Sequence, residues 1–312
     1  MTFQDINTLA KSKTPFLFIS DFKAQNIQLH TLSTLKDEDI LFSINEDYTP
    51  HLHTHTLKKT PLAFQDYKQK FDKIIQEIKK GNTYLLNLTQ PTKISTHLTL
   101  NEIYHNANAK YKLKYKDEFV CFSPEAFITI KNNTIHTYPM KGTIDATIHN
   151  AKEKILANEK EMAEHIMVVD LLRNDLSMVA KKVRVQKFRY TTTIDAGEKK
   201  LLQVSSHISG HLEIHWQERL GDILQTLLPA GSISGTPKRK TLEIINTLEN
   251  YERDYFSGVL GVFDGENFHS GVMIRFIQKT QDGYIYKSGG GITIDSDATE
   301  EYKELLQKVY IP

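Results

Sequence analysis

The chain has 312 residues, with 39 Lys and Arg against 38 Asp and Glu, and it contains a single cysteine, Cys121. The formal net charge of +1 gives no basic surplus that would favour nucleic acid as a partner, and one cysteine excludes both an internal disulfide and a Cys-x-x-Cys metal site. No apolar run approaches the roughly 18–20 residues that span a bilayer, and the N-terminus lacks a signal-peptide core, so we expect a cytoplasmic, globular protein without a membrane partner.

The first 60 residues are predicted to contain two short buried strands, at 16–20 and 39–44. After them, His51, His53 and His55 alternate along the chain, so a strand would place all three side chains on one face. Such a face could bind a metal ion. A solvated strand edge explains the same pattern, because no carboxylate or cysteine lies close by.

The pattern becomes helical after residue 61, where apolar residues recur every three or four positions from 64 to 78. Lys79 and Lys80 place cations at the C-terminal end of this predicted helix, and Gly81 supplies a cap. Further helices are predicted at 150–175, 216–228 and 237–249. Strands are predicted at 83–90, 119–123, 126–130, 183–188 and 201–212.

The last third of the chain carries hairpin signals. An apolar run at 258–263 is joined through Asp264-Gly265 to a second run at 268–278, and a turn at 282–283 leads to a third at 284–288. Asp297 and Glu300 resemble a capping box that begins a last helix, ending near residue 309. Because strands cluster in hairpins separated by helices and no linker divides the chain, we predict one α+β domain with largely antiparallel sheet.

Two pairs of glutamates have the spacing that places carboxylates on one helix face: Glu161 with Glu164, and Glu301 with Glu304. If the two helices pack side by side, the four carboxylates could converge on Mg²⁺, which favours one or two carboxylates, retained waters and an anionic substrate. Two ordinary solvated helix faces are the alternative. The dense apolar run after Glu164 indicates that this carboxylate is not fully solvated.

Two glycine-rich segments could approach an anionic ligand closely. The segment GSISGTPK (231–238) precedes a predicted helix, whose free main-chain amides attract anions. It is not a P-loop, because Thr236 and Pro237 stand where that motif needs Gly and Lys, and an ordinary turn is the alternative. Gly289, Gly290 and Gly291 leave a predicted strand, and three adjacent glycines imply either a positive φ or a tight approach.

Three more residues could act on such a ligand. Lys141, at a predicted strand end, could be a desolvated nucleophile, although an isolated lysine is more often a surface cation. Glu125 lies between apolar strands, where burial would raise the pKa of its carboxyl towards general-acid chemistry. Arg275 stands in the apolar strand 272–277 and needs a partner, for which a planar carboxylate is suited. Together these features predict a pocket with Mg²⁺ for a small polyanion such as a dicarboxylate.

Nine segments follow one another in the order of a known family. They are GNTYLLNLTQ (81–90), SPEAF (123–127), PMKGT (139–143), AEHIMVVDLLRNDL (163–176), LQVSSHISGHL (202–212), PAGSISGTPK (229–238), GVLGVF (258–263), MIRF (273–276) and GGGITIDSDATEEYKELLQKV (289–309). With these segments the chain resembles the chorismate-utilising enzymes, which include aminodeoxychorismate, anthranilate, isochorismate and salicylate synthases. The resemblance implies one domain over 1–312, with two sheets packed face to face and helices outside. Residues 1–60 would be a shortened N-terminal portion and 61–312 the catalytic core.

The resemblance implies a role for each candidate residue. It makes Glu164 and Glu304 ligands of Mg²⁺, with Glu161 and Glu301 just outside them, and the metal holds the ring carboxylate of chorismate. Glu125 matches the acid that protonates the departing 4-hydroxyl. The positions implied to contact substrate are Arg275, Gly289, Gly290, Gly291, Lys308, Ser234, Thr236, Thr143 and Gln203.

Lys141 favours one branch of the family, because PMKGT carries Lys where anthranilate synthases typically carry Ala. The resemblance to aminodeoxychorismate synthases implies that the Lys141 amine adds at ring carbon 2 as the 4-hydroxyl leaves, and that ammonia then attacks carbon 4 and expels the lysine. The amine must be uncharged, so we expect desolvation or nearby cations to lower the pKa of Lys141. Ammonia would come from a separate glutamine amidotransferase subunit, and the product would serve 4-aminobenzoate and folate synthesis.

Four departures from the family pattern leave alternatives open. Leu85 stands where amino-transferring members have Gln and isochorismate and salicylate synthases have a water-activating Lys, while Gln203 replaces a His. Val262 replaces a Tyr that reaches the enolpyruvyl carboxylate. The N-terminal region is also short where anthranilate synthases bind feedback tryptophan. The alternatives are an anthranilate synthase large subunit, which Lys141 disfavours, and an inactive chorismate-binding relative.

Overall fold

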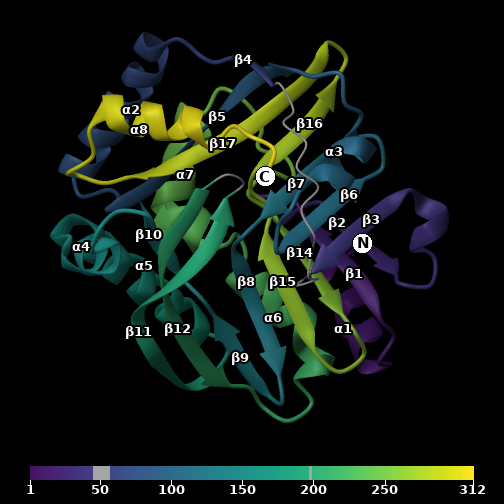
Figure 1. Cartoon of the computed structure of the whole chain (residues 1–312). Coiled ribbons are helices and arrows are strands. Elements are labelled where there is room, and N and C mark those ends of the chain that lie inside the picture. Colours follow the sequence, from purple (N-terminus) through teal and green to yellow (C-terminus); the bar gives the residue numbers. More distant parts are fainter. Residues whose placement is uncertain (45–56, 197–198) are drawn as a thin grey trace.

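The computed structural model describes residues 1–44, 57–196 and 199–312, which form two sheets with helices around them (Figure 1). Within these residues the first sheet has nine strands: β1 (Phe16–Ser20), β2 (Ile27–Thr31), β8 (Ala126–Lys131), β9 (Thr134–Thr137), β10 (Met140–Asp145), β11 (Lys181–Ala196), β12 (Lys199–His211), β14 (Val259–Phe263) and β15 (Phe268–Val272). The second has eight: β3 (Ile40–Ile44), β4 (Lys58–Thr60), β5 (Leu85–Ser95), β6 (Tyr111–Tyr115), β7 (Phe119–Ser123), β13 (Gly235–Thr236), β16 (Phe276–Thr280) and β17 (Gly283–Ile292).

Each strand pairs antiparallel with its neighbours. The first sheet runs β10-β12-β9-β8-β15-β14-β1-β2, with β11 paired to β12. The second runs β13-β5-β17-β16-β7-β6-β3, with β4 paired to β5. The hairpins β14–β15 and β16–β17 form at the predicted turns. The predicted α+β fold with antiparallel sheets is therefore confirmed.

Strand β1 shows how the sheets are packed. Phe16 and Phe18 join the apolar cluster that contains helix residues such as Leu224, whereas Leu17 and Ile19 join a cluster with residues of the second sheet. Both faces of β1 are covered in this way, and all five of its residues are buried. That is why the segment has a continuous apolar sequence rather than an alternating one.

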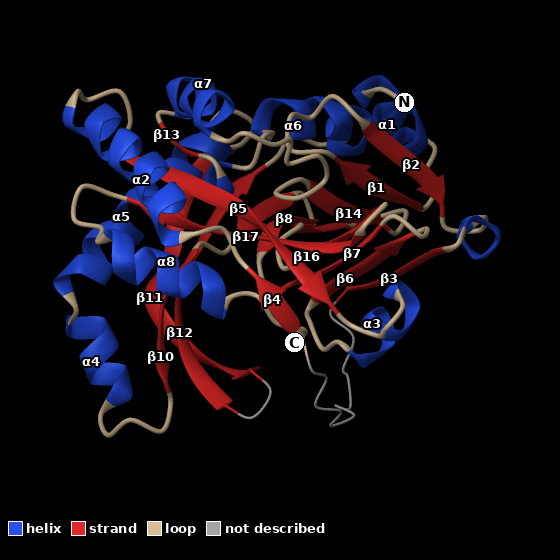
Figure 2. Cartoon of the chain, turned by 90° about the horizontal axis from the view of Figure 1, so that it is seen from above, coloured by secondary structure: helices blue, strands red, loops and turns tan. Residues whose placement is uncertain are grey.

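The helices lie outside the sheets (Figure 2). They are α1 (Phe3–Lys11), α2 (Phe64–Lys79), α3 (Leu100–Asn106), α4 (Ala151–Ala157), α5 (Glu159–Ser177), α6 (Leu220–Leu227), α7 (Lys238–Leu248) and α8 (Ala298–Gln307), with short 3-10 turns at Leu35–Glu38, Trp216–Arg219 and Gly231–Ile233. Helix α2 buries Tyr67, Phe71, Ile74 and Ile78, which confirms the predicted apolar spacing. None of the helices in the described residues is long and apolar enough to cross a membrane.

Two predicted elements are broken in the structure. The helix predicted at 150–175 is α4 followed by α5, because Asn158 adopts extended backbone and caps α5 by accepting a hydrogen bond from the Glu161 N–H. The strand predicted at 268–278 is β15 followed by β16, which belong to different sheets. Arg275 lies between them with a φ of 53°, so its predicted place inside a strand is wrong.

Helices α1 and α3 were not predicted, although each begins with a capping box. In α1 the pair is Thr2 and Asp5, and in α3 it is Thr99 and Glu102. The histidines at 51, 53 and 55 lie outside the described residues.

Candidate active site

A cavity of about 180 Å³ brings together most of the residues that the sequence singled out. Its walls come from β5, β10 and β17, from the segment before β13, and from the chain between β15 and β16. The predicted residues that line it are Glu125, Lys141, Ser234, Arg275, Gly289, Gly290, Gly291 and Lys308. A concave site with several convergent polar groups is the usual form of a small-molecule site.

Lys141 is the second residue of β10 and forms an ion pair with Glu164 of α5, with 2.8 Å between Nζ and the carboxylate. Its side chain is 26% exposed and that of Glu164 is 8% exposed. Burial opposes the charge of Lys141, but the charge of Glu164 and the hydrogen bond to it outweigh burial and raise the pKa of Lys141. The predicted lowering of this pKa is therefore wrong for this arrangement, because the nearest charge is a carboxylate.

Glu161 lies one helical turn before Glu164 on α5. Its Oε2 is buried without a hydrogen-bond partner and packs against Gly142, 3.0 Å from where a Cβ on that glycine would lie. Burial raises the pKa of Glu161, with Lys141 opposing and Glu164 adding to the rise. A buried carboxylate oxygen without a partner is a position that a cation can satisfy.

The two α8 carboxylates of the predicted magnesium site have partners of their own. Glu304 forms an ion pair with Lys308 at 2.7 Å, and Glu301 accepts a hydrogen bond from Ser296 at 2.8 Å. Burial raises the pKa of Glu301. Burial would also raise the pKa of Glu304, but Lys308 outweighs it and lowers that pKa. The Glu304 side chain is 54% exposed, so water reaches its carboxylate.

The described residues contain no group of three or more His, Cys, Asp or Glu close enough to hold a metal ion. Instead, Glu164 is paired with Lys141 and Glu304 with Lys308. The donor set nevertheless fits Mg²⁺, because this ion commonly takes one or two protein carboxylates and completes its shell with water and substrate. The unpartnered Oε2 of Glu161 supports the fit. The magnesium site stays a prediction.

Glu125 lies in the short link between β7 and β8 and lines the cavity. Burial raises the pKa of Glu125, and it outweighs the hydrogen bond from Ser232 and the charges of Lys308 and Lys141, which lower this pKa. The predicted rise is confirmed. A carboxyl that keeps its proton to higher pH than usual can act as a general acid.

Two cations line the cavity near these groups. Lys308 follows α8 and donates a hydrogen bond to the Gly289 carbonyl at 2.9 Å. The Arg275 guanidinium stacks on Tyr310, 4.5 Å from the ring centre, and its Nη1 is buried without a partner. An unpaired guanidinium N–H at a cavity wall is suited to a ligand carboxylate.

The three glycines are strand residues and not a loop. Gly289, Gly290 and Gly291 pair with β5 within β17, and none has a positive φ. Without side chains, these glycines can lie close to β5, since a Cβ on Gly289 would be only 2.7 Å from the Leu88 carbonyl oxygen. A Cβ on Gly291 would lie 3.6 Å from Lys141 Nζ, so this wall approaches the lysine amine.

Some predicted residues lie elsewhere. Thr143 and Gln203 face each other in the β10–β12 ladder, and neither is among the residues that line the cavity. Thr236, in β13, pairs with Leu85 of β5, which lines the cavity. Val262 lies in β14, packed against the cluster between the sheets, so its departure from the family pattern does not alter the cavity lining.

Leu85 does line the cavity, and two polar residues that sequence reasoning missed lie with it. Asn87 Oδ1 and Ser257 Oγ are buried without partners, and both residues belong to the wall. Asn87 could have been found, because it lies two positions after Leu85 on one strand and therefore on the same face. No comparable signal marks Ser257.

Residues 5–312 match the family described as chorismate binding enzyme. A protein from Haemophilus influenzae, described as uncharacterized and PabA-like, is 49% identical over 99% of this chain and 95% of its own length. Aminodeoxychorismate synthase component 1 of Bacillus subtilis is 33% identical over 80% of this chain, and the match covers 55% of that protein.

One solved structure with a similar fold is MenF of Escherichia coli, described as a menaquinone-specific isochorismate synthase. It superposes with a TM-score of 0.73, covering 96% of this chain and 78% of that one. Because the identity is 16%, this likeness concerns the fold alone.

Proposed function

The chain belongs to the chorismate-binding enzyme family, and from this premise we propose that it converts chorismate and ammonia to 4-amino-4-deoxychorismate. The observation that carries the proposal is a single cavity lined by both a lysine amine, Lys141, and a carboxyl with a raised pKa, Glu125. The resemblance to aminodeoxychorismate synthase component 1 supports the same choice.

Chorismate carries two carboxylates, and the cavity offers cations for them. Arg275 has a buried N–H without a partner, and Lys308 lies beside the glycine strand. We expect these two cations to bind the carboxylates and to orient the ring with its 4-hydroxyl towards Glu125.

The reaction then needs a nucleophile and an acid. The Lys141 amine adds at ring carbon 2, the ring double bonds shift, and the carbon 4–oxygen bond breaks. Glu125 gives its proton to the departing hydroxyl, which leaves as water. Ammonia next attacks carbon 4 and the lysine nitrogen is expelled from carbon 2, so the net exchange replaces the hydroxyl by an amino group.

Glu164 and Glu304 would hold Mg²⁺, with Glu161 and Glu301 beside them. The ion would neutralise the ring carboxylate of chorismate when bound. Glu164 has a second task, because it keeps Lys141 charged as long as it is paired with it. Release of Glu164 from the lysine leaves burial as the main influence on the amine, and burial favours the uncharged form that can add to the ring.

We also propose that ammonia comes from a glutamine amidotransferase subunit. The support is the name component 1 carried by the Bacillus subtilis relative.

The identity of the product tests this proposal. Purified protein is supplied with chorismate, ammonium and Mg²⁺, and the products are identified by mass spectrometry. We expect 4-amino-4-deoxychorismate and no anthranilate. Anthranilate would overturn the assignment, and unchanged chorismate would favour an inactive chorismate-binding relative.

A further inference from the structure

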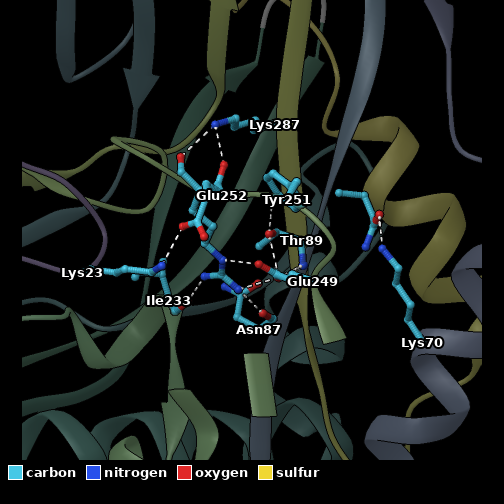
Figure 3. Close-up of polar contacts among 11 residues, drawn as sticks. Lys23, Lys70, Asn87, Thr89, Ile233, Glu249, Tyr251, Glu252 and Lys287 are labelled. Carbon is cyan, nitrogen blue, oxygen red and sulfur yellow. Dashed lines mark hydrogen bonds and ion pairs between the residues drawn. The ribbon is translucent and has the colours of Figure 1, made fainter. Parts of the chain in front are cut away.

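Glu249 and Arg253 form a buried ion pair. Figure 3 shows Glu249 beside Thr89 and Asn87, with dashed lines marking the polar contacts around it. Arg253 Nε is 2.7 Å from one carboxylate oxygen of Glu249, and Nη2 is 2.7 Å from the other. The two side chains are 2% and 3% exposed. Two parallel hydrogen bonds of this kind fix both position and orientation, because the guanidinium and the carboxylate are planar.

The same guanidinium also holds the main chain of the wall. Nη1 donates to the Ile233 carbonyl at 3.1 Å, and Nη2 donates to the Asn87 carbonyl at 2.7 Å. Ile233 and Asn87 both line the cavity, as do Phe256 and Ser257, which follow Arg253 in the chain. One side chain therefore joins three wall segments that are distant in sequence.

Glu249 binds the wall as well. Its Oε1 accepts hydrogen bonds from both the N–H and the hydroxyl of Thr89, each at 2.8 Å. Thr89 lies two positions after Asn87 on β5, so the carboxylate and the guanidinium hold the same strand at neighbouring points.

Lys287 connects a fourth wall segment, strand β17, to the hydrogen bonds around the Glu249–Arg253 pair. It is 1% exposed, and its Nζ donates to the main-chain carbonyls of Glu252 at 3.1 Å and Arg253 at 2.8 Å. Lys287 lies on β17 between Tyr286 and Ser288, and both of these neighbours line the cavity, as do the three glycines that follow. The turn at 252–253 is thereby tied to the glycine strand.

A buried ion pair of this kind contributes little net stability, because removing two charges from water costs about as much free energy as their attraction returns. Apolar residues can often replace such a pair without lowering the stability of the fold. Here the hydrogen bonds of the pair end on residues in or next to the cavity. Asn87 also has a side-chain oxygen that is buried without a partner, so its placement decides where a ligand donor can bind.

We propose that the Glu249–Arg253 ion pair is a positioning device for the substrate cavity: it holds Asn87 and Ile233 at the places that chorismate binding requires. This inference rests on the proposed function, since it takes chorismate as the ligand. Neither residue lines the cavity, so both are positioning residues that act through the wall.

The test is Arg253→Lys, which keeps a positive charge opposite Glu249 but lacks the planar fork that reaches both carbonyls. We expect the dissociation constant of chorismate, measured by equilibrium titration, to rise about tenfold or more, and KM to rise with it. The matched control is Lys23→Gln. It breaks the exposed ion pair of Lys23 with Glu252, 2.7 Å long, without changing any residue that holds the wall, and should leave both constants unchanged.

A merely structural role predicts a different result. Arg253→Lys would then lower the melting temperature but, at a temperature where circular dichroism shows it folded, would bind chorismate as the wild type does. That result would overturn the inference and leave the proposed function intact. If Arg253→Lys does not fold, Glu249→Gln takes its place, because it keeps the side-chain size and removes only the charge. A wild type that does not bind chorismate at all would overturn the proposed function, and this inference with it.

Discussion

Replacing Lys141 by Met removes the amine and keeps the stem of the side chain. It leaves Glu164, whose side chain is 8% exposed, without its ion-pair partner. Removing one partner of a fully buried pair costs roughly 3–5 kcal/mol. Because Lys141 is 26% exposed, water can reach part of the site, so we expect the free energy of unfolding to fall by about 1–3 kcal/mol.

The double variant Lys141→Met/Glu164→Gln separates the charge from the chemistry. Without the buried carboxylate charge, the free energy of unfolding should return towards that of the wild type, as measured by urea denaturation at neutral pH. Activity should not return, because neither variant has the nucleophile, and mass spectrometry should find no 4-amino-4-deoxychorismate from either. The reasoning is refuted if the single variant is as stable as the wild type, or if it forms this product at the wild-type rate.

Other substitutions test the acid, the glycine strand and the last helix. The Glu125→Gln variant cannot give up a proton, so its kcat should fall about 100-fold or more while chorismate still binds, and an unchanged kcat would exclude the acid role. In the wild type, Glu125 loses its proton as pH rises through its raised pKa, so kcat should decline on the alkaline side of the pH profile. Gly289→Ala places a Cβ 2.7 Å from the Leu88 carbonyl oxygen and should lower the free energy of unfolding by about 1–3 kcal/mol. Gly290→Ala should change that free energy little, because the atom nearest to its new Cβ is 3.4 Å away. Equal urea midpoints for the two variants would contradict this difference. Asp297→Ala removes the cap that accepts hydrogen bonds at the start of α8 and should cost about 1 kcal/mol in the same measurement, so a wild-type midpoint would show that the cap is dispensable.

Local patterns predicted the elements whose causes are local. The spacing of Tyr67, Phe71, Ile74 and Ile78 is enough to identify α2, and Asp297 identifies the start of α8. The capping boxes at the starts of α1 and α3 are equally local, but these helices are short and carry too little apolar periodicity for the pattern to predict them.

The errors have long-range causes. The apolar run at 268–278 gives no sign that the chain crosses between sheets at Arg275, because strands of both sheets are equally apolar. The raised pKa of Lys141 depends on Glu164, which reaches it from another element of the fold. The glycines at 289–291 were predicted to leave the preceding strand, yet pairing with β5 keeps them within β17.

The residues of the cavity divide in the same way, into those that motifs predict and those whose role depends on long-range contacts. The family motifs identify Lys141, Glu125 and Arg275, which meet in the cavity as expected. The Glu249–Arg253 pair belongs to none of those predictions, because its significance lies in the carbonyls it reaches and not in any motif.

The central claim is that Lys141 forms a transient bond to the ring of the substrate. It is tested most directly by quenching the enzyme with acid during incubation with chorismate and Mg²⁺ in the absence of ammonia, and by measuring the mass of the protein and of its proteolytic peptides. We predict an adduct equal to chorismate less one water on the peptide that contains Lys141, which disappears when ammonium is added. Rapid formation of 4-amino-4-deoxychorismate by an enzyme that shows no such adduct at any quench time would contradict the account.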